Sequence, residues 1–192
     1  MAASVAPPRV AMRDVGKTCR RDSPASATNM NYVLKQKLVS LGNNFMIKGL
    51  DGAEAFQVKG ELASLGDKLS FEDLDGNELV YIEQKIFNWV AYYELWRDGK
   101  RLADVKRDFF SFRRHRFTVD VEGSDDLEAV GDFLNWEYNL KRGDRKIATF
   151  TRQWFRLSPT FFVGIEDDES DHTLVLAVAL VILVVTARRH NY

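Results

Sequence analysis

Most of the chain is built from short runs in which apolar and polar residues alternate, separated by turn signals. The run AYYELWR, residues 91–97, illustrates the pattern, because successive side chains of a strand point to opposite faces. One face would carry Tyr93, Leu95 and Arg97, and the other Tyr92, Glu94 and Trp96. Such alternation is typical of strands that bury one face and expose the other.

Turn signals recur along this pattern. Asp-Gly pairs stand at Asp51-Gly52, Asp75-Gly76 and Asp98-Gly99, about 24 residues apart, and Gly123 and Gly143 continue the series. Each pair suits a tight turn, because Gly tolerates positive φ and Asp can bond its own backbone. With the hairpin WEYNLKRGDRKIATFTRQW, this predicts about ten to twelve short antiparallel strands that close as a sandwich or barrel. A solenoid is disfavoured, because the units share a turn but no residue-by-residue motif.

The C-terminal part breaks the pattern with an unbroken apolar run, Leu174–Val185, which reaches fifteen residues with its small flanking residues. As a helix it would be about 22 Å long, against roughly 30 Å of membrane hydrocarbon. Acidic residues at 166–171 and the pair Arg188-Arg189 block its extension, and they suit the two ends of a soluble helix capped by Ser170 or Asp171.

This run has no polar face, so a helix formed by it has to be surrounded by protein. Its β-branched residues weaken helices and leave a buried strand as the alternative. A closed antiparallel barrel that wraps one apolar helix would bury the run and leave no exposed sheet edge.

Composition then limits the classes of protein. The chain has 192 residues, a formal net charge of −1 and one cysteine, Cys19, which excludes an intrachain disulfide and favours a cytoplasmic location. Residues 1–29 hold three of the four prolines and carry a net charge of +3. They are interpreted as a disordered tail or as an early start ahead of Met30, with a transit peptide as the alternative. The barrel domain is expected over residues 30–192.

Four segments, which follow one another along the chain, resemble the LURP-one-related family. They are YVLKQKLVSLGNNFMIKGLDG (32–52), ELASLGDKLSFEDLDGNELVYIEQK (61–85), YYELWRDGKRLADVKRDFFSF (92–112) and RFTVDVEGSDDLEAVGDFLNWEYNLKRGDRKIATFTRQWF (116–155). The apolar C-terminal run stands where that family has its last element. The resemblance covers residues 30–192.

The resemblance implies a Tubby C-terminal-like fold, in which about twelve antiparallel strands close around a hydrophobic C-terminal helix. Phospholipid scramblases resemble the same superfamily, and its small members have no established enzymatic activity. Tubby proteins bind phosphoinositide head groups, but no Tubby lipid-binding motif matches this sequence position by position. The resemblance therefore implies a fold and leaves the ligand open.

The strongest local charge lies in KRLADVKRDFFSFRRHRF, which has a net charge of +5. Its cations are Lys100, Arg101, Lys106, Arg107, Arg113, Arg114 and Arg116. With the interleaved Phe109, Phe110 and Phe112, they suit an anionic phospholipid head group or membrane surface, where Arg offers bidentate geometry. Lys106, Arg107, Arg113 and Arg114 would contact phosphate, and Phe110 or Phe112 the acyl boundary. The alternative is a solvated strand face with paired cations and core phenylalanines.

Other candidate sites are weaker. The acidic residues at 166–171 could bind calcium or simply cap a helix, and DLDGNE at 73–78 lacks the spacing of a calcium loop and reads as a hairpin turn. No catalytic motif occurs, and Cys19 lies in the predicted tail, so we expect a non-enzymatic protein with no catalytic residue, metal or cofactor. An enzyme would need a pocket in which His115 or His172 meets a carboxylate.

The sequence therefore predicts a cytoplasmic binding module, peripheral at a membrane, whose partner is an anionic phospholipid. A regulatory module that binds a protein or nucleic acid is one alternative, because phosphates of nucleic acid attract the same cations. A scramblase-like protein with its C-terminal helix in lipid is the other.

Overall fold

The computed structural model describes residues 30–35, 45–61, 68–87, 90–108, 114–132, 136–155 and 158–188. These residues form strands and one helix, so the predicted mainly β architecture is confirmed. The elements are β1 (Met30–Lys35), β2 (Phe45–Gly49), β3 (Glu54–Glu61), β4 (Lys68–Glu72), β5 (Glu78–Phe87), β6 (Val90–Arg97), β7 (Lys100–Asp108), β8 (Arg114–Val121), β9 (Leu127–Asp132), β10 (Glu137–Arg142), β11 (Arg145–Phe155), β12 (Ser158–Ile165) and α1 (His172–Arg188).

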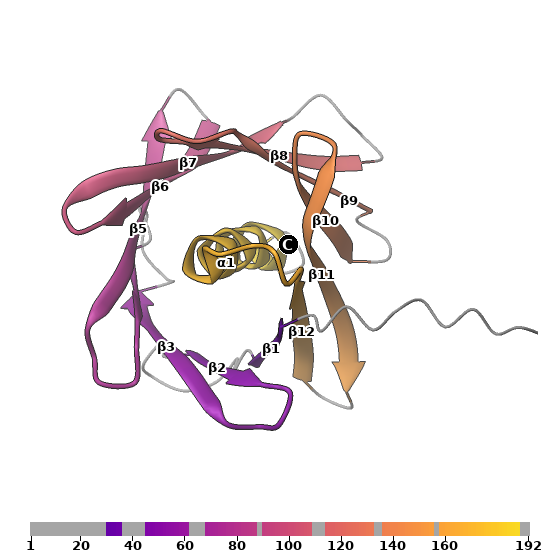
Figure 1. Ribbon diagram of the computed structural model, residues 1–192. Coiled ribbons are helices and arrows are strands. Elements are labelled where there is room, and N and C mark those ends of the chain that lie inside the picture. The colour runs from indigo at the N-terminus through magenta and orange to yellow at the C-terminus, as the bar shows by residue number, and fades with distance from the viewer. Residues whose placement is uncertain are drawn as a thin grey trace, which may run out of the picture.

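The strands form one closed antiparallel barrel, and α1 runs through its centre (Figure 1). Each strand pairs with its neighbours in sequence, and β1 pairs with β12 to close the sheet, with Met30 opposite Ile165. Closure leaves no strand with an unpaired edge, which removes the aggregation risk of an open sheet. The sequence predicted either a sandwich or a barrel, and the chain forms the barrel.

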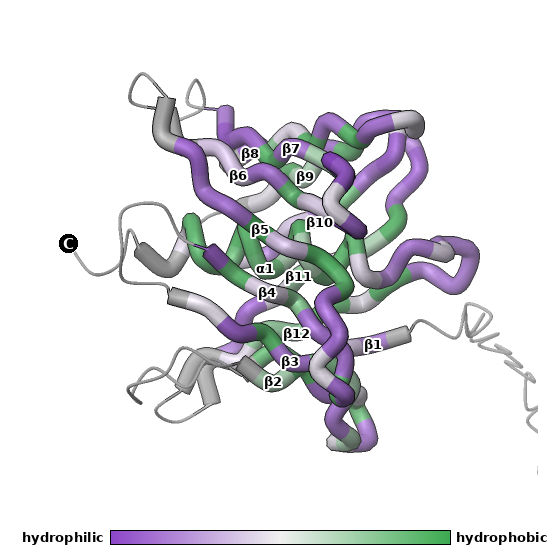
Figure 2. Tube along the Cα trace, turned by 90° about the vertical axis from the view of Figure 1, so that its left-hand side faces the viewer, coloured by the Kyte–Doolittle hydropathy of each residue, from purple (hydrophilic) through white to green (hydrophobic). Residues whose placement is uncertain are grey.

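The glycine turns gather at one end of this barrel, where α1 also begins. All five predicted glycines have positive φ, between 57° and 89°, in agreement with the predicted turns. We call this the α1-start end; its connections are residues 50–53, 73–77, 98–99, 122–126, 143–144 and 166–171. They contain acidic residues and no Lys or Arg. In Figure 2 the turns project to the right as largely hydrophilic loops.

At the opposite end, which we call the α1-exit end, β7 ends at Asp108, β8 begins at Arg114 and α1 ends at Arg188. The strands and the helix thus run the length of the barrel between these two ends.

The helix is the centre of the hydrophobic core. Every residue from Leu174 to Val184 is buried, and Val175, Leu176 and Val178 are fully inaccessible to solvent. Packing against the inner face of the barrel on all sides overrides the weak helix propensity of the β-branched residues. The alternative prediction, that the apolar run Leu174–Val185 forms a buried strand, is therefore wrong. Within the described part of the chain, no helix has both the length and the apolar character required to cross a membrane.

The start of α1 is fixed by Asp171, whose predicted capping role is confirmed. Its Oδ1 accepts a hydrogen bond from the Leu174 amide at 3.0 Å, and Arg97 donates to both of its carboxylate oxygens at 2.9 Å. Arg97 also donates to the Thr173 hydroxyl at 2.6 Å. Burial raises the pKa of the Asp171 carboxyl, but the hydrogen bonds from Arg97, Leu174 and Thr173 outweigh it, so this pKa lies below its usual value. The contact joins the end of β6 to the helix start.

Candidate functional site

The structure divides the predicted basic region between the two ends of the barrel. Lys100 begins β7 at the α1-start end, whereas Arg107 lies at the α1-exit end of the same strand. Seven residue steps along a strand separate them by about 23 Å. Arg114 and Arg116 in β8 lie with Arg107, because Asp108 at the end of β7 pairs with Arg116. One ligand head group therefore cannot contact all seven predicted cations together.

Two of the cations belong to an ion-pair network on the outer face of the barrel. Glu94 in β6 and Asp104 in β7 lie directly opposite each other and are nearly buried, although both are acidic. Arg101 forms an ion pair with Asp104, and the Lys106 Nζ lies 3.7 Å from the same carboxylate. Lys85 is 3.9 Å from Glu94. Because facing like charges destabilise a sheet, Arg101 and Lys106 are needed here to neutralise them.

The remaining cations lie near the α1-exit end. The Arg116 Nε is 2.5 Å from a Glu128 oxygen, in an exposed pair on the outer face. Arg107 pairs with the buried Phe117, so both side chains lie on the inner face of the sheet. The Nε atom of Arg107 is buried. Arg114 begins β8.

Phe109, Phe110, Phe112 and Arg113 of the predicted basic region lie outside the described residues. Their roles stay predictions.

The acidic residues at 166–171 face cations of the neighbouring strands. Glu169 is buried and lies 2.9 Å from the Arg142 Nη1, and Glu166 lies 3.0 Å from the Lys146 Nζ. Asp168 forms an ion pair with Arg145. These contacts hold the segment that leads into α1 against β10 and β11, and they favour the capping interpretation over a calcium site.

The DLDGNE stretch forms the hairpin turn that its sequence predicts. The Asn77 amide donates to the Asp73 Oδ1 at 2.8 Å, and the Asp73 amide donates to the Asn77 carbonyl at 3.0 Å. Across the described ranges, no group of three or more His, Cys, Asp and Glu side chains is placed to hold a metal ion.

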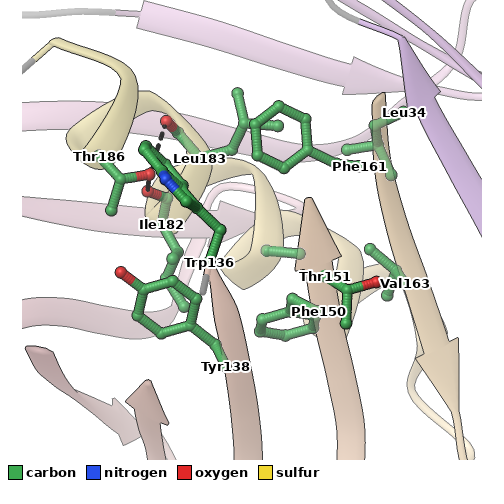
Figure 3. Close-up of a pocket in the computed structure, with 11 residues that line it drawn as sticks. Leu34, Trp136, Tyr138, Phe150, Thr151, Phe161, Val163, Ile182, Leu183 and Thr186 are labelled. Carbon is green, nitrogen blue, oxygen red and sulfur yellow. Dashed lines mark hydrogen bonds between the residues drawn. The ribbon is translucent and has the colours of Figure 1, made fainter. Parts of the chain in front are cut away.

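A pocket at the α1-exit end is the candidate site that the structure adds. It lies between the last turns of α1 and the wall formed by β1, β10, β11 and β12 (Figure 3). Its lining residues are Leu34, Trp136, Tyr138, Phe150, Thr151, Phe161, Val163, Ala179, Ile182, Leu183 and Thr186. Neither His172 nor any acidic residue is among them, so the arrangement that an enzyme hypothesis requires is not found in this pocket.

Thr186, the polar residue that α1 contributes to this lining, bonds the backbone of its own helix. The Thr186 hydroxyl donates to the Ile182 carbonyl at 2.6 Å and lies 3.1 Å from the Leu183 carbonyl oxygen (Figure 3). A hydroxyl that bonds the preceding turn in this way is satisfied without a ligand. The helix side of the pocket is therefore effectively apolar.

Arg152 does not line this pocket but contacts two of the aromatic rings that do. Its Cζ lies 4.0 Å from the centre of the Trp136 ring and 5.5 Å from that of Phe161, and both rings line the pocket. Arg152 pairs with Phe161 across the sheet and alternates with the buried Phe150 and Ala148 along β11, which places it on the inner face. Burial lowers the pKa of its guanidinium, because the charged form is partly desolvated.

Reasoning from the sequence missed this residue, although the signal was available. In IATFTRQW the positions that alternate inward are Ala148, Phe150 and then Arg152. A charged residue at a core position of a regular strand pattern is unusual and marks a candidate site.

Comparison with known proteins identifies the family. The family model described as LURP-one-related matches residues 30–183, which is most of the chain. The chain belongs to the LURP-one-related family. This match confirms the resemblance that the four sequence segments indicated. The closed barrel around a C-terminal helix is the fold that the resemblance implied.

Two further comparisons give a relative and a solved structure. The chain is 30% identical over 149 residues to the "Uncharacterized protein YxjI" of Bacillus subtilis (strain 168), covering 78% of this chain and 89% of YxjI. The X-ray structure of an Arabidopsis thaliana protein, AT5G01750, superimposes with a TM-score of 0.58 at 19% identity, covering 84% of this chain and 92% of that one. At this identity the structural likeness supports the fold alone.

Proposed function

We propose that this LURP-one-related chain is a non-enzymatic binding module that docks on an anionic phospholipid surface with its α1-exit end. The observation that carries the proposal is the separation of charge between the barrel ends. The connections of the α1-start end contain acidic residues and no Lys or Arg, whereas the described strand ends at the α1-exit end carry Lys35, Lys68, Arg107, Arg114 and Arg116 against Glu61, Asp108, Asp132 and Glu137. An anionic surface attracts the second end and repels the first.

The sequences that join strands at the α1-exit end support this orientation. Residues 36–44, 62–67, 88–89, 109–113, 133–135 and 156–157 lie outside the described residues, and by composition they contain several Leu and Phe and a single acidic residue, Asp67. Apolar and aromatic residues next to cations are the composition expected where a protein meets the lipid interface. Such a module would be peripheral at a membrane in the cytoplasm.

Vesicle co-sedimentation tests the proposal. The chain should pellet with vesicles of phosphatidylcholine and phosphatidylserine, not with pure phosphatidylcholine, and binding should weaken as salt rises. Reversing two charges, Arg114→Glu with Arg116→Glu, should weaken binding at least about thirtyfold, because each cation near an anionic surface contributes roughly 1 kcal/mol.

The matched control reverses two cations at the other end, Lys100→Glu with Lys146→Glu, which changes the net charge by the same amount. Lys146 is ion-paired as Arg116 is, so both variants break one surface pair. We expect the control to retain binding within about threefold, since exposed pairs contribute little to stability. Equal loss in both variants, or equal binding to neutral vesicles, contradicts the proposal. A gel shift with nucleic acid at physiological salt, without lipid preference, would favour the interaction-module alternative.

A further inference from the structure

Two neighbouring hairpin turns at the α1-start end each expose a leucine. Leu50, between β2 and β3, is 62% exposed, and Leu74, between β4 and β5, is 52% exposed. Among the residues that the structure describes, these are the large hydrophobic side chains that lie exposed. The turns lie side by side, because β3 pairs with β4 and the Gln57 Nε2 atom donates to the Asp73 carbonyl at 3.1 Å. Single exposed leucines are common, but two on adjoining turns form a patch that a further segment can cover.

These turns are also strongly acidic. Residues 49–54 and 73–78, which we call the two-leucine surface, each contain the sequence Leu-Asp-Gly-x-Glu. Together they carry five acidic residues and no Lys or Arg. Lys48 offsets one of these charges, because its Nζ lies 3.2 Å from a Glu54 oxygen. The surface is therefore apolar at its leucines and negative around them, which fits a segment that combines apolar residues with cations.

Two other turns of the same end lack this combination. The Asp98-Gly99 turn has Arg97 at the position of the leucine, and Lys100 follows it. The turn at residues 122–126 is acidic, but the leucine that follows it, Leu127, is buried. A basic and partly apolar segment is therefore expected to prefer the two-leucine surface to these turns.

The chain itself supplies such a segment at this place. Met30 pairs with Ile165 at the α1-start end, and Tyr32 pairs with Gly49, next to Leu50. Residues 1–29 therefore join the barrel beside the two-leucine surface. By composition they carry five Lys and Arg against two acidic residues, with valine and methionine between the cations. Attachment at Met30 also gives this segment a high effective concentration at the surface.

We infer that residues 1–29 bind the two-leucine surface of their own barrel, with their cations on its carboxylates and their apolar residues on Leu50 and Leu74. Charge complementarity and the position of Met30 select this occupant over a segment of another molecule, which would have to bind from solution. The surface lies at the end opposite the cations assigned to the membrane, so the inference does not depend on the proposed function.

A nitroxide spin label on Cys19 tests the inference in the full chain, because Cys19 is its single cysteine and lies within residues 1–29. Paramagnetic broadening of the backbone amide signals reports which residues the label approaches. At low salt the amides of residues 50–53 and 73–77 should be broadened more than those of the acidic turn at residues 122–126. High salt should reduce the difference, since it screens exposed charges.

Substitutions on the surface separate binding from mere attachment at Met30, which they leave unchanged. Leu50→Ser with Leu74→Ser should weaken the contact roughly tenfold, because two leucines lose the apolar area that the segment covers. Asp51→Asn with Asp75→Asn should also weaken it, through the loss of two charges. Asparagine before glycine retains the turn chemistry, so the hairpins should keep their form.

The matched control removes two charges from another turn of the same end. Glu122→Gln with Asp125→Asn should leave the broadening of residues 50–53 and 73–77 unchanged. Broadening that persists in full in the double leucine variant overturns the inference, because attachment alone would then explain it. Equal loss in the control overturns the assignment to the two-leucine surface. Broadening of an isotope-labelled chain by a separate spin-labelled chain would show that a second copy supplies the segment, which overturns the assignment to the same barrel.

Discussion

Replacing Leu176 by alanine is expected to lower the free energy of unfolding by about 3 kcal/mol, within the range for buried leucines. Leu176 lies in the middle of α1 and is fully inaccessible to solvent. The barrel surrounds the helix on all sides, so the sheet cannot collapse into the space that the leucine leaves. Urea denaturation, followed by circular dichroism, measures the change.

Leu74 provides the matched control, because it is a leucine that is 52% exposed in a turn at the α1-start end. Leu74→Ala should change stability by less than about 0.5 kcal/mol, as surface substitutions usually do. Similar losses for the two variants would show that Leu176 is not enclosed, and would contradict the packing of α1 described above.

Gly131→Ala is expected to destabilise the chain by about 2 to 3 kcal/mol through overpacking. A Cβ at Gly131 would lie 2.1 Å from the Cδ1 of Tyr138 and within 2.5 Å of two other ring atoms. Tyr138 pairs with Gly131 across β9 and β10 and its ring is buried, so it has little room to withdraw. Denaturant midpoints for the two proteins provide the measurement.

Gly164 in β12 is the comparison glycine, because a Cβ there meets only the Asn31 side-chain oxygen, at 2.9 Å. That oxygen ends a flexible side chain, so Gly164→Ala should cost less than Gly131→Ala. A double-mutant cycle isolates the cause: in a Tyr138→Ala background the cost of Gly131→Ala should largely disappear. A cost that persists without the tyrosine ring would place the strain elsewhere.

The architecture was predictable because its signals are local. Each Asp-Gly pair specifies a turn through the conformational freedom of one glycine, and the acidic and basic flanks of the apolar run specify a helix too short to span a membrane. Asp171 shows the limit of such reasoning. Its capping role follows from its position ahead of the helix, but its pairing with Arg97 depends on closure of the barrel, which brings together residues far apart in sequence.

The candidate sites were predictable only in part, for a related reason. Lys100 and Arg107 look like one basic cluster along the sequence, yet an extended strand carries them to opposite ends of the barrel. In the sequence Arg101 and Lys106 look available for a ligand. In the structure they neutralise the charge of the facing carboxylates of Glu94 and Asp104. The pocket beside Arg152 depends on how α1 packs against four strands, which no local pattern specifies.

Native-state hydrogen exchange of the α1 amides tests the central claim, that the chain's own barrel encloses an apolar helix. Residues 174–184 lie at the centre of the core, so their amides should exchange only when the whole domain unfolds. Their exchange free energies should then equal the global free energy of unfolding from denaturant and match those of β5 and β6. Exchange of α1 at much lower free energy, while these strands stay protected, would show that the helix leaves an intact barrel and would contradict the account.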